Sequence, residues 1–216
     1  MVKLEKKIDF KKILSILEKT HHPTMLEILK EYTPFQLLVA TLLSARTKDS
    51  RLIPIVQKLF QEYPQPEDFI KIPLPVLEQK LYTVGFYRMK AKNVKKLSQI
   101  VVERYYGQIP ITFSELTSLP GVGRKTANCI LACVFHQPAI GVDTHVHRIS
   151  NRLGWVKTNT PEETEEELNM LVTKAFWVKV NNLLVDHGQR ICQPLKPRCG
   201  ECSIREYCVF GKSLVH

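Results

Sequence analysis

The chain has 216 residues, of which 44% are hydrophobic, so it is long and apolar enough for one large or two small domains and is not expected to be disordered. Lysine and arginine outnumber aspartate and glutamate by 31 to 21, and the net charge of +10 favours a polyanionic partner such as nucleic acid or an anionic membrane surface. The longest apolar run, residues 129–135, is far shorter than the ~20 residues that span a bilayer, and residues 1–7 lack a signal-peptide core, so we expect a cytoplasmic or nucleoid protein with no membrane segment.

Helix signals occur along the whole chain. No run of alternating apolar and polar residues bounded by hairpin turns indicates a strand, so the sequence predicts an all-α fold. An apolar stripe at positions 13, 14, 16 and 17 predicts an N-terminal helix. Thr33 places a capping hydroxyl before Pro34, and residues 35–43, apolar nearly all round, predict that the following helix is deeply buried.

The middle of the chain is predicted to hold a connection and then a long helix. Prolines are dense between Pro64 and Pro75, which predicts one extended connection. Downstream, Val94 and Leu97 share one face of a helix that Gly107 is expected to end.

The segment LPGVGRK at residues 119–125 predicts two helices joined by a glycine hairpin, since Gly121 and Gly123 both permit positive φ angles. Backbone amides at such a helix start can hold a phosphate without reading base sequence, although from Gly-x-Gly alone an ordinary helix corner is the simpler interpretation. Lys125 then lies beside the positive helix end and Arg124, and both disfavour protonation of its amine. Lys125 is either a nucleophile or another phosphate contact.

Asp143 precedes a helical pattern that continues to Leu153, and as an N-cap it would be unremarkable. The same carboxylate beside a DNA-bound amine could stabilise positive charge on a deoxyribose or move a proton. Further along, Thr160 before Pro161 predicts another helix start, with Glu163 completing a reciprocal cap.

Four cysteines close the chain in the pattern Cys192-x6-Cys199-x2-Cys202-x5-Cys208. In a reducing compartment, clustered cysteines are more readily metal ligands than disulfides. Zinc sites usually offer paired knuckles separated by a longer loop, whereas these thiolates include a single Cys-x2-Cys pair, so the spacing favours a [4Fe-4S] cluster. The cluster would staple a segment with few large apolar residues and project Lys196 and Arg198 towards DNA phosphate.

Three linked segments resemble the endonuclease III family of the helix-hairpin-helix DNA glycosylase superfamily. They are LPGVGRKTAN at residues 119–128, VDTHVHR at residues 142–148, and the four-cysteine pattern. Residues 42–45, 84–87 and 187–188 follow the same order, so the resemblance covers nearly the whole chain.

The resemblance implies two all-α lobes: a six-helix domain at residues 27–137 that contains the helix-hairpin-helix, and an iron-sulfur cluster domain made of residues 1–26 and 138–216. It implies a base-excision-repair DNA glycosylase with AP lyase activity, acting as a monomer on double-stranded DNA that contains damaged bases or abasic sites. Its substrates would be oxidised pyrimidines such as thymine glycol. Lys125 would be the nucleophile that forms a Schiff base, and Asp143 the catalytic carboxylate.

The resemblance also implies DNA contacts, and two of them depart from the family pattern. Many bacterial relatives carry glutamine where this chain has Arg46, which could fill the gap left by an extruded nucleotide and bond an orphan guanine. Phe86 replaces a leucine wedge, and it is either a wedge or part of the core. The full set of expected DNA contacts is Arg46, Phe86, Leu119, Gly121, Val122, Gly123, Arg124, His145, Lys196 and Arg198.

Two other functions compete with this interpretation. A mismatch-specific glycosylase acting on G·T or G·U pairs would use water in place of lysine, and relatives of that kind generally lack the hairpin lysine. A non-catalytic iron-sulfur DNA-binding protein would use the cluster for electron transfer and the hairpin only as a grip.

Overall fold

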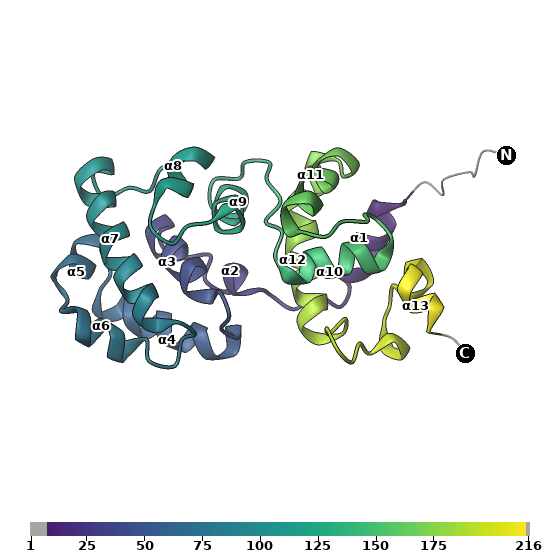
Figure 1. Ribbon diagram of the computed structural model, residues 1–216, viewed down its shortest axis with the longest axis horizontal. Coiled ribbons are helices and arrows are strands. Elements are labelled where there is room, and N and C mark those ends of the chain that lie inside the picture. The colour runs from purple at the N-terminus through teal and green to yellow at the C-terminus, as the bar shows by residue number, and fades with distance from the viewer. Residues whose placement is uncertain (1–7, 215–216) are drawn as a thin grey trace. The chain divides into compact units, whose positions relative to one another are not determined.

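The computed structural model describes residues 8–214, which contain helices and no β-strand (Figure 1), so the all-α prediction is confirmed. These residues form two compact units. The central unit is Thr24–Gln137, and the terminal unit combines the described residues up to Pro23 with those from Pro138 on. Among the described residues, no helix is long and apolar enough to cross a membrane.

The central unit contains eight α-helices among its described residues, where six were expected. In chain order they are α2 (Met25–Ile28), α3 (Pro34–Ser44), α4 (Asp49–Glu62), α5 (Pro66–Lys71), α6 (Leu74–Lys80), α7 (Tyr87–Tyr105), α8 (Phe113–Ser118) and α9 (Arg124–Cys133). The proline-rich segment predicted to be extended instead forms α5 and α6. The reason is that Pro66 and Pro75 lie in the first turn of a helix, where a missing N–H removes no helical hydrogen bond. The boundary expected at residue 27 would also have cut α2.

Helix α3 is the core of the central unit, as its sequence predicted. Thr33 Oγ1 accepts from the Gln36 amide at 3.3 Å, and Gln36 Oε1 accepts from the Thr33 amide at 3.0 Å, which fixes the start of the helix. Every residue from Phe35 to Leu43 is buried. Helix α3 packs against α4, α7 and α9, so it supports both the long helix and the hairpin helix.

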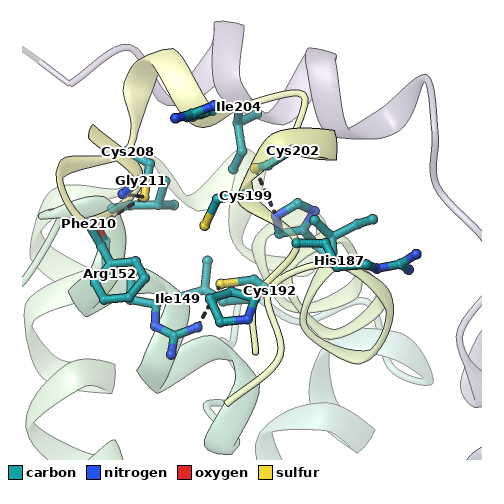
Figure 2. Close-up of a pocket in the computed structure, with 15 residues that line it drawn as sticks. Ile149, Arg152, His187, Cys192, Cys199, Cys202, Ile204, Cys208, Phe210 and Gly211 are labelled. Atoms are coloured by element: carbon teal, nitrogen blue, oxygen red, sulfur yellow. Dashed lines mark hydrogen bonds between the residues drawn. The ribbon is translucent and has the colours of Figure 1, made fainter. Parts of the chain in front are cut away.

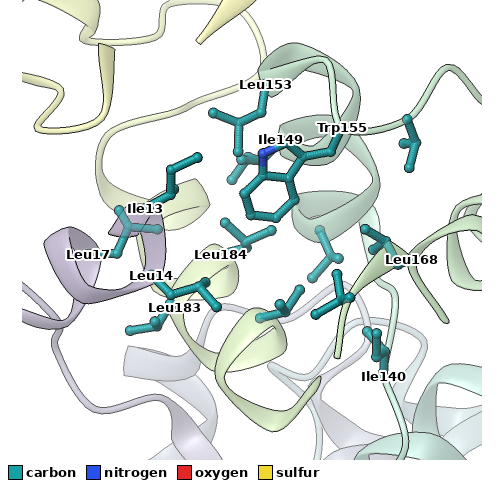
Figure 3. Close-up of a cluster of buried hydrophobic side chains, with 14 of the residues drawn as sticks. Ile13, Leu14, Leu17, Ile140, Ile149, Leu153, Trp155, Leu168, Leu183 and Leu184 are labelled. Carbon is teal, nitrogen blue, oxygen red and sulfur yellow. The ribbon is translucent and has the colours of Figure 1, made fainter. Parts of the chain in front are cut away.

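In the terminal unit, an apolar cluster joins the N-terminal helix to the C-terminal half of the chain (Figure 3). Ile13, Leu14 and Leu17 of the N-terminal helix pack with Ile149 and other buried residues of the C-terminal half. Its helices are α1 (Phe10–Glu18), α10 (Thr144–Leu153), α11 (Pro161–Leu171), α12 (Trp177–Arg190) and α13 (Val209–Ser213), with 3-10 turns at Lys174–Phe176, Cys199–Glu201 and Arg205–Tyr207.

The start of α11 differs by one residue from the predicted reciprocal cap. Thr160 Oγ1 accepts from the Glu163 amide at 3.2 Å, as expected. Glu163 Oε2, however, accepts from the amide of Asn159 at 2.8 Å, one residue before the predicted donor.

Candidate functional site

The glycine hairpin has the predicted helix–turn–helix form. Helix α8 ends at Ser118, the Val122 amide closes the turn by donating to the Leu119 carbonyl at 3.1 Å, and α9 starts at Arg124 with Gly123 as its N-cap. Gly121 has φ of 80°, but Gly123 has φ of −93° and is extended, so only the first glycine uses the left-handed region that was expected of both.

Gly123 is nevertheless the more open of the two glycines. A Cβ added there would meet no atom within 4 Å, so the absent side chain leaves free space at the amino end of α9. The amides of the first helical turn lack carbonyl partners within the helix, and the helix dipole is positive there. This arrangement suits close approach of an anion to the backbone.

The side chains of the hairpin divide between core and surface. Leu119 and Val122 are buried, so any contact that they make with DNA is through the backbone. Arg124 is exposed, and its guanidinium carbon lies 5.1 Å from the centre of the Phe113 ring. Lys125 is half-buried in the first turn of α9.

Asp143 is the N-cap of α10, which confirms that part of its prediction. Its Oδ1 accepts from the amides of His145 at 2.8 Å and Val146 at 3.0 Å. Because both cap bonds use Oδ1, the cap does not occupy Oδ2. A carboxylate held in this way can stabilise a nearby positive charge while it keeps its structural role.

His145 is packed tightly behind this cap. Arg148 Nη2 lies 3.1 Å from His145 Nδ1, and since a guanidinium can only donate, Nδ1 accepts and the ring proton of the neutral histidine is on Nε2. A Cβ on Gly188 would meet His145 Nδ1 at 2.6 Å and its Cβ at 2.8 Å. The glycine in the His187–Gly188 pair therefore gives α10 and the His145 ring room against α12.

Arg46 and Phe86 form a pair on the surface of the central unit. The two residues have φ of 55° and 58°, a region that L-residues seldom occupy, and the Arg46 guanidinium carbon lies 5.2 Å from the centre of the Phe86 ring. Phe86 is 56% exposed, which excludes the prediction that it is a core residue. Strained exposed residues of this kind are typical of functional surfaces.

Lys90 holds the turn that carries Arg46 through hydrogen bonds to backbone carbonyls. Its side chain is buried, and Nζ donates to the carbonyls of Leu43 at 2.8 Å and Ala45 at 2.5 Å, at the carboxyl end of α3. Burial lowers the pKa of Lys90 from 10.5 to about 8. The turn is also tied through Thr47 Oγ1, which accepts from the Gly85 amide at 3.1 Å.

The four cysteines line one cavity of the terminal unit (Figure 2). Its empty space, part of which is open to solvent, is about 370 Å³. Helix α10, the end of α12 and the segment after Cys192 supply its walls. All four cysteines of residues 192–208 thus line the same cavity, and their role as cluster ligands stays a prediction.

The thiols around the cavity fit the donor set of an iron-sulfur cluster. Among the described residues, no group of three or more His, Cys, Asp and Glu side chains is arranged to hold one metal ion. Each thiolate of a four-iron cluster binds its own iron, so four sulfurs around a cavity need not converge on one point. All four cysteines offer thiols as donors, and the Gly211 amide donates to Cys208 Sγ at 3.2 Å.

Burial shapes the protonation of the groups around this cavity. Burial raises the pKa of the Cys202 and Cys208 thiols, a shift that metal binding would reverse because iron binds the thiolate. Burial lowers the pKa of His187 to about 4, so its ring is neutral at pH 7. His187 Nε2 lies 3.6 Å from Cys202 Sγ.

Two basic residues, Lys196 and Arg198, lie between Cys192 and Cys199, and both are exposed, but Arg198 also makes hydrogen bonds within the protein. Arg198 donates through Nε and Nη2 to the Arg190 carbonyl at 3.1 and 2.6 Å, and through Nη1 to Glu201 at 3.2 Å. Arg198 therefore helps to shape the loop, and Lys196 is the better placed of the two to meet a phosphate.

Sequence reasoning missed the structural roles of Lys90 and Arg152. Lys90 precedes Val94 and Leu97 by four and seven residues, which places it on the apolar face of α7, and this spacing was the available signal of its burial. Arg152 carried no comparable signal, because its partners lie in the cysteine loop.

The chain thus combines a helix-hairpin-helix, in which Gly123 is open and Lys125 follows, with a cavity lined by four cysteines. Residues 39–174 match the HhH-GPD superfamily of base excision DNA repair proteins. The chain is 48% identical over 181 residues to endonuclease III of Thermotoga maritima, covering 84% of this chain and 85% of that protein. The chain belongs to the endonuclease III family of the HhH-GPD superfamily.

Solved structures agree on the fold. A trapped endonuclease III–DNA covalent intermediate matches with a TM-score of 0.82 and 34% identity, covering 97% of this chain and 100% of that chain. A thermostable thymine-DNA glycosylase matches with the same TM-score of 0.82 at 24% identity, covering 94% of each chain, and at that identity the likeness shows the fold alone. The fold therefore does not choose the substrate, and the site residues must do so.

Proposed function

We infer that the protein is a base-excision-repair DNA glycosylase with AP lyase activity, which removes oxidised pyrimidines such as thymine glycol from duplex DNA. The observation that carries this proposal is the hairpin of an endonuclease III family chain, with Gly123 open at the start of α9 and Lys125 in its first turn. We further propose that it acts as a monomer on DNA with damaged bases or abasic sites, at the nucleoid.

In this proposal the hairpin holds the DNA backbone. The amides at the start of α9 bind a phosphate, with the open space at Gly123 allowing close approach and exposed Arg124 adding charge. A damaged nucleotide swings out of the duplex at a cost of a few kcal/mol, which damage reduces by weakening stacking or pairing. Phosphate contacts of this kind fix position and leave the choice of base to the pocket.

Lys125 and Asp143 are the proposed catalytic residues. The Lys125 amine attacks C1′ as the glycosidic bond breaks, and the Asp143 carboxylate stabilises the positive charge on the sugar or helps to deprotonate the incoming amine. The departing base leaves an imine between Lys125 and the opened sugar. The imine acidifies the C2′ hydrogens, so the 3′ phosphate can leave by β-elimination, which is the lyase reaction.

Arg46 and Phe86 are proposed to occupy the gap left by the extruded nucleotide. The exposed Phe86 ring suits a wedge between base pairs, and the stacked Arg46 presents planar donors that match guanine. His145 is proposed as a further DNA contact.

The thiolates of Cys192, Cys199, Cys202 and Cys208 are proposed to hold a [4Fe-4S] cluster in the iron-sulfur domain. When bound, this cofactor supplies a structural staple and a one-electron redox centre. The loop between the first two ligands carries Lys196 and Arg198, and we propose that Lys196 in particular contacts DNA phosphate.

Borohydride trapping tests the catalytic proposal. Lys125→Gln should bind thymine glycol DNA but give no trapped protein–DNA adduct, because it lacks the amine. The matched control is Arg124→Gln, which removes the neighbouring charge and should bind more weakly yet still form the adduct at saturating protein. An adduct with Lys125→Gln would assign another nucleophile.

The same assay separates the two competing functions. Wild-type protein that releases thymine from G·T pairs without any adduct would favour the mismatch glycosylase, and binding without base release would favour a non-catalytic protein.

A further inference from the structure

Arg152 lies at the centre of the cysteine loop without being a ligand. Its Nη1 donates to Cys192 Sγ at 3.2 Å and to the Gln193 carbonyl at 2.8 Å, while Nη2 donates to the Pro194 carbonyl at 2.7 Å. Its guanidinium carbon also lies 4.6 Å from the centre of the Phe210 ring, which follows the last cysteine (Figure 2). One side chain thus joins the first cysteine, the start of the loop and the final helix.

These contacts need the shape of arginine. A planar guanidinium can donate from two nitrogens to separate acceptors while its face stacks on an aromatic ring, whereas a lysine ammonium offers a single point of charge. A donor aimed at a sulfur is stabilising when the sulfur carries negative charge, since charge-assisted hydrogen bonds are the stronger ones. Hydrogen bonds to ligand sulfurs are also one of the means by which a protein sets a cluster's reduction potential.

We propose that Arg152 is a positioning residue for the iron-sulfur cofactor, holding Cys192 in place and raising the reduction potential of the cluster through its bond to Cys192 Sγ. This inference rests on the proposed cofactor. Reduction adds one electron, and so one negative charge, to the cluster and its thiolates. A cationic donor at a sulfur stabilises that added charge, so losing the donor should make the cluster harder to reduce.

Arg148 and Arg205 also lie near the cavity, and their contacts differ from those of Arg152. Arg148 also contacts Cys192, but it donates to the carbonyl oxygen, through Nε at 3.1 Å and Nη2 at 2.8 Å. Arg205 lines the same cavity, and among the described residues no hydrogen bond joins it to a cysteine sulfur. Among the described arginines that line the cavity, which are Arg152, Arg198 and Arg205, Arg152 is the one with a hydrogen bond to a cysteine sulfur. The Arg148 guanidinium also interacts with the Cys192 side chain, so Arg205 is the control for charge alone.

The experiment compares Arg152→Gln, Arg152→Lys and Arg205→Gln in the full-length, cluster-loaded protein. Iron and sulfide content give loading, the bleaching rate with a chelator gives retention, and voltammetry on DNA-free protein gives the one-electron potential. Arg152→Gln should shift the oxidised-to-reduced equilibrium about tenfold towards the oxidised form, which is a fall of ~59 mV. The cluster of Arg152→Gln should also bleach faster than that of the parent when the chelator is added. Arg152→Lys should recover most of the potential but not the slow bleaching, and Arg205→Gln should change both less.

Each outcome supports or overturns the inference. If Arg152→Gln folds but does not load while Arg205→Gln loads, the holding role is supported, and Arg152→Lys then tests the potential. Equal shifts in Arg152→Gln and Arg205→Gln would show an effect of net charge and overturn the role of the sulfur bond. An unchanged potential and bleaching rate in Arg152→Gln would overturn the whole inference. A wild-type protein without iron and sulfide would instead refute the proposed cofactor.

Discussion

Gly121 and Gly123 are two residues apart in the same hairpin, yet alanine at these two positions should change different properties of the protein. Gly121 has φ of 80°, and a Cβ there would meet Asn93 Nδ2 at 2.7 Å and Leu42 Cδ1 at 3.1 Å. Gly123 has φ of −93°, and a Cβ there would meet nothing within 4 Å. We therefore expect Gly121→Ala to destabilise the fold and Gly123→Ala to weaken DNA binding.

The two magnitudes follow from these contacts. A left-handed alanine costs about 1–2 kcal/mol and the crowding about 1–3 more, so Gly121→Ala should lose roughly 2–5 kcal/mol of stability. At about 2–4 °C per kcal/mol for a chain of this size, its Tm should fall by roughly 4–20 °C. At Gly123 a weaker N-cap and a less flexible unfolded chain nearly cancel, so stability should stay within about 0.5 kcal/mol. A lost amide–phosphate hydrogen bond of about 1.5–3 kcal/mol should weaken DNA binding tenfold or more.

Thermal unfolding by circular dichroism and DNA binding by fluorescence anisotropy measure the two effects. Binding must be compared at one salt concentration, because phosphate contacts are strongly salt-dependent. If Gly123→Ala keeps its stability and binds DNA like the parent, the start of α9 does not hold a phosphate. If Gly121→Ala is as stable as the parent, the hairpin can relax and our reasoning on its backbone is wrong.

Three further predictions concern other parts of the site. Asp143→Asn keeps an oxygen for the α10 cap and should lose base release in single-turnover assays without losing stability, whereas Asp143→Ala should also lose about 1 kcal/mol in urea unfolding. For Lys90, burial lowers the native pKa to about 8 while the unfolded chain keeps 10.5, so the unfolded state binds more protons in between. Stability should therefore rise by about 1–3 kcal/mol as pH increases from 8 to 10, and Lys90→Met should remove this rise. Lys196→Ala should reduce the slope of log binding constant against log salt by about one phosphate contact.

Each of these has a contrary result. Equal loss of base release and stability in Asp143→Asn would indicate a purely structural carboxylate. A parallel pH dependence in the parent and Lys90→Met would mean that the carbonyl bonds hold the Lys90 amine fully charged. An unchanged salt slope in Lys196→Ala would place the cysteine loop away from the DNA.

Much of the local structure could be predicted because neighbouring residues determine it. Thr33 and Pro34 specify the start of α3, and Asp143 specifies the start of α10, through side-chain bonds that reach three residues at most. The same local rules explain an error. Proline density was taken to mean extended chain, although Pro66 and Pro75 fit the first turn of a helix equally well.

The features that could not be predicted depend on contacts between distant residues. Lys90 reaches Leu43 across 47 positions, and Arg152 reaches Cys192 across 40. The last carbonyls of any helix lack partners, but sequence does not say which of them tertiary packing will bury or which side chain will reach them. At the end of α3 a buried amine meets that need, and the turn carrying Arg46 is held there as a result. The exposed Arg46–Phe86 pair therefore depends on the buried side chain of Lys90. A sequence motif could point to Arg46 and Phe86, but it could not show which residue holds them in place.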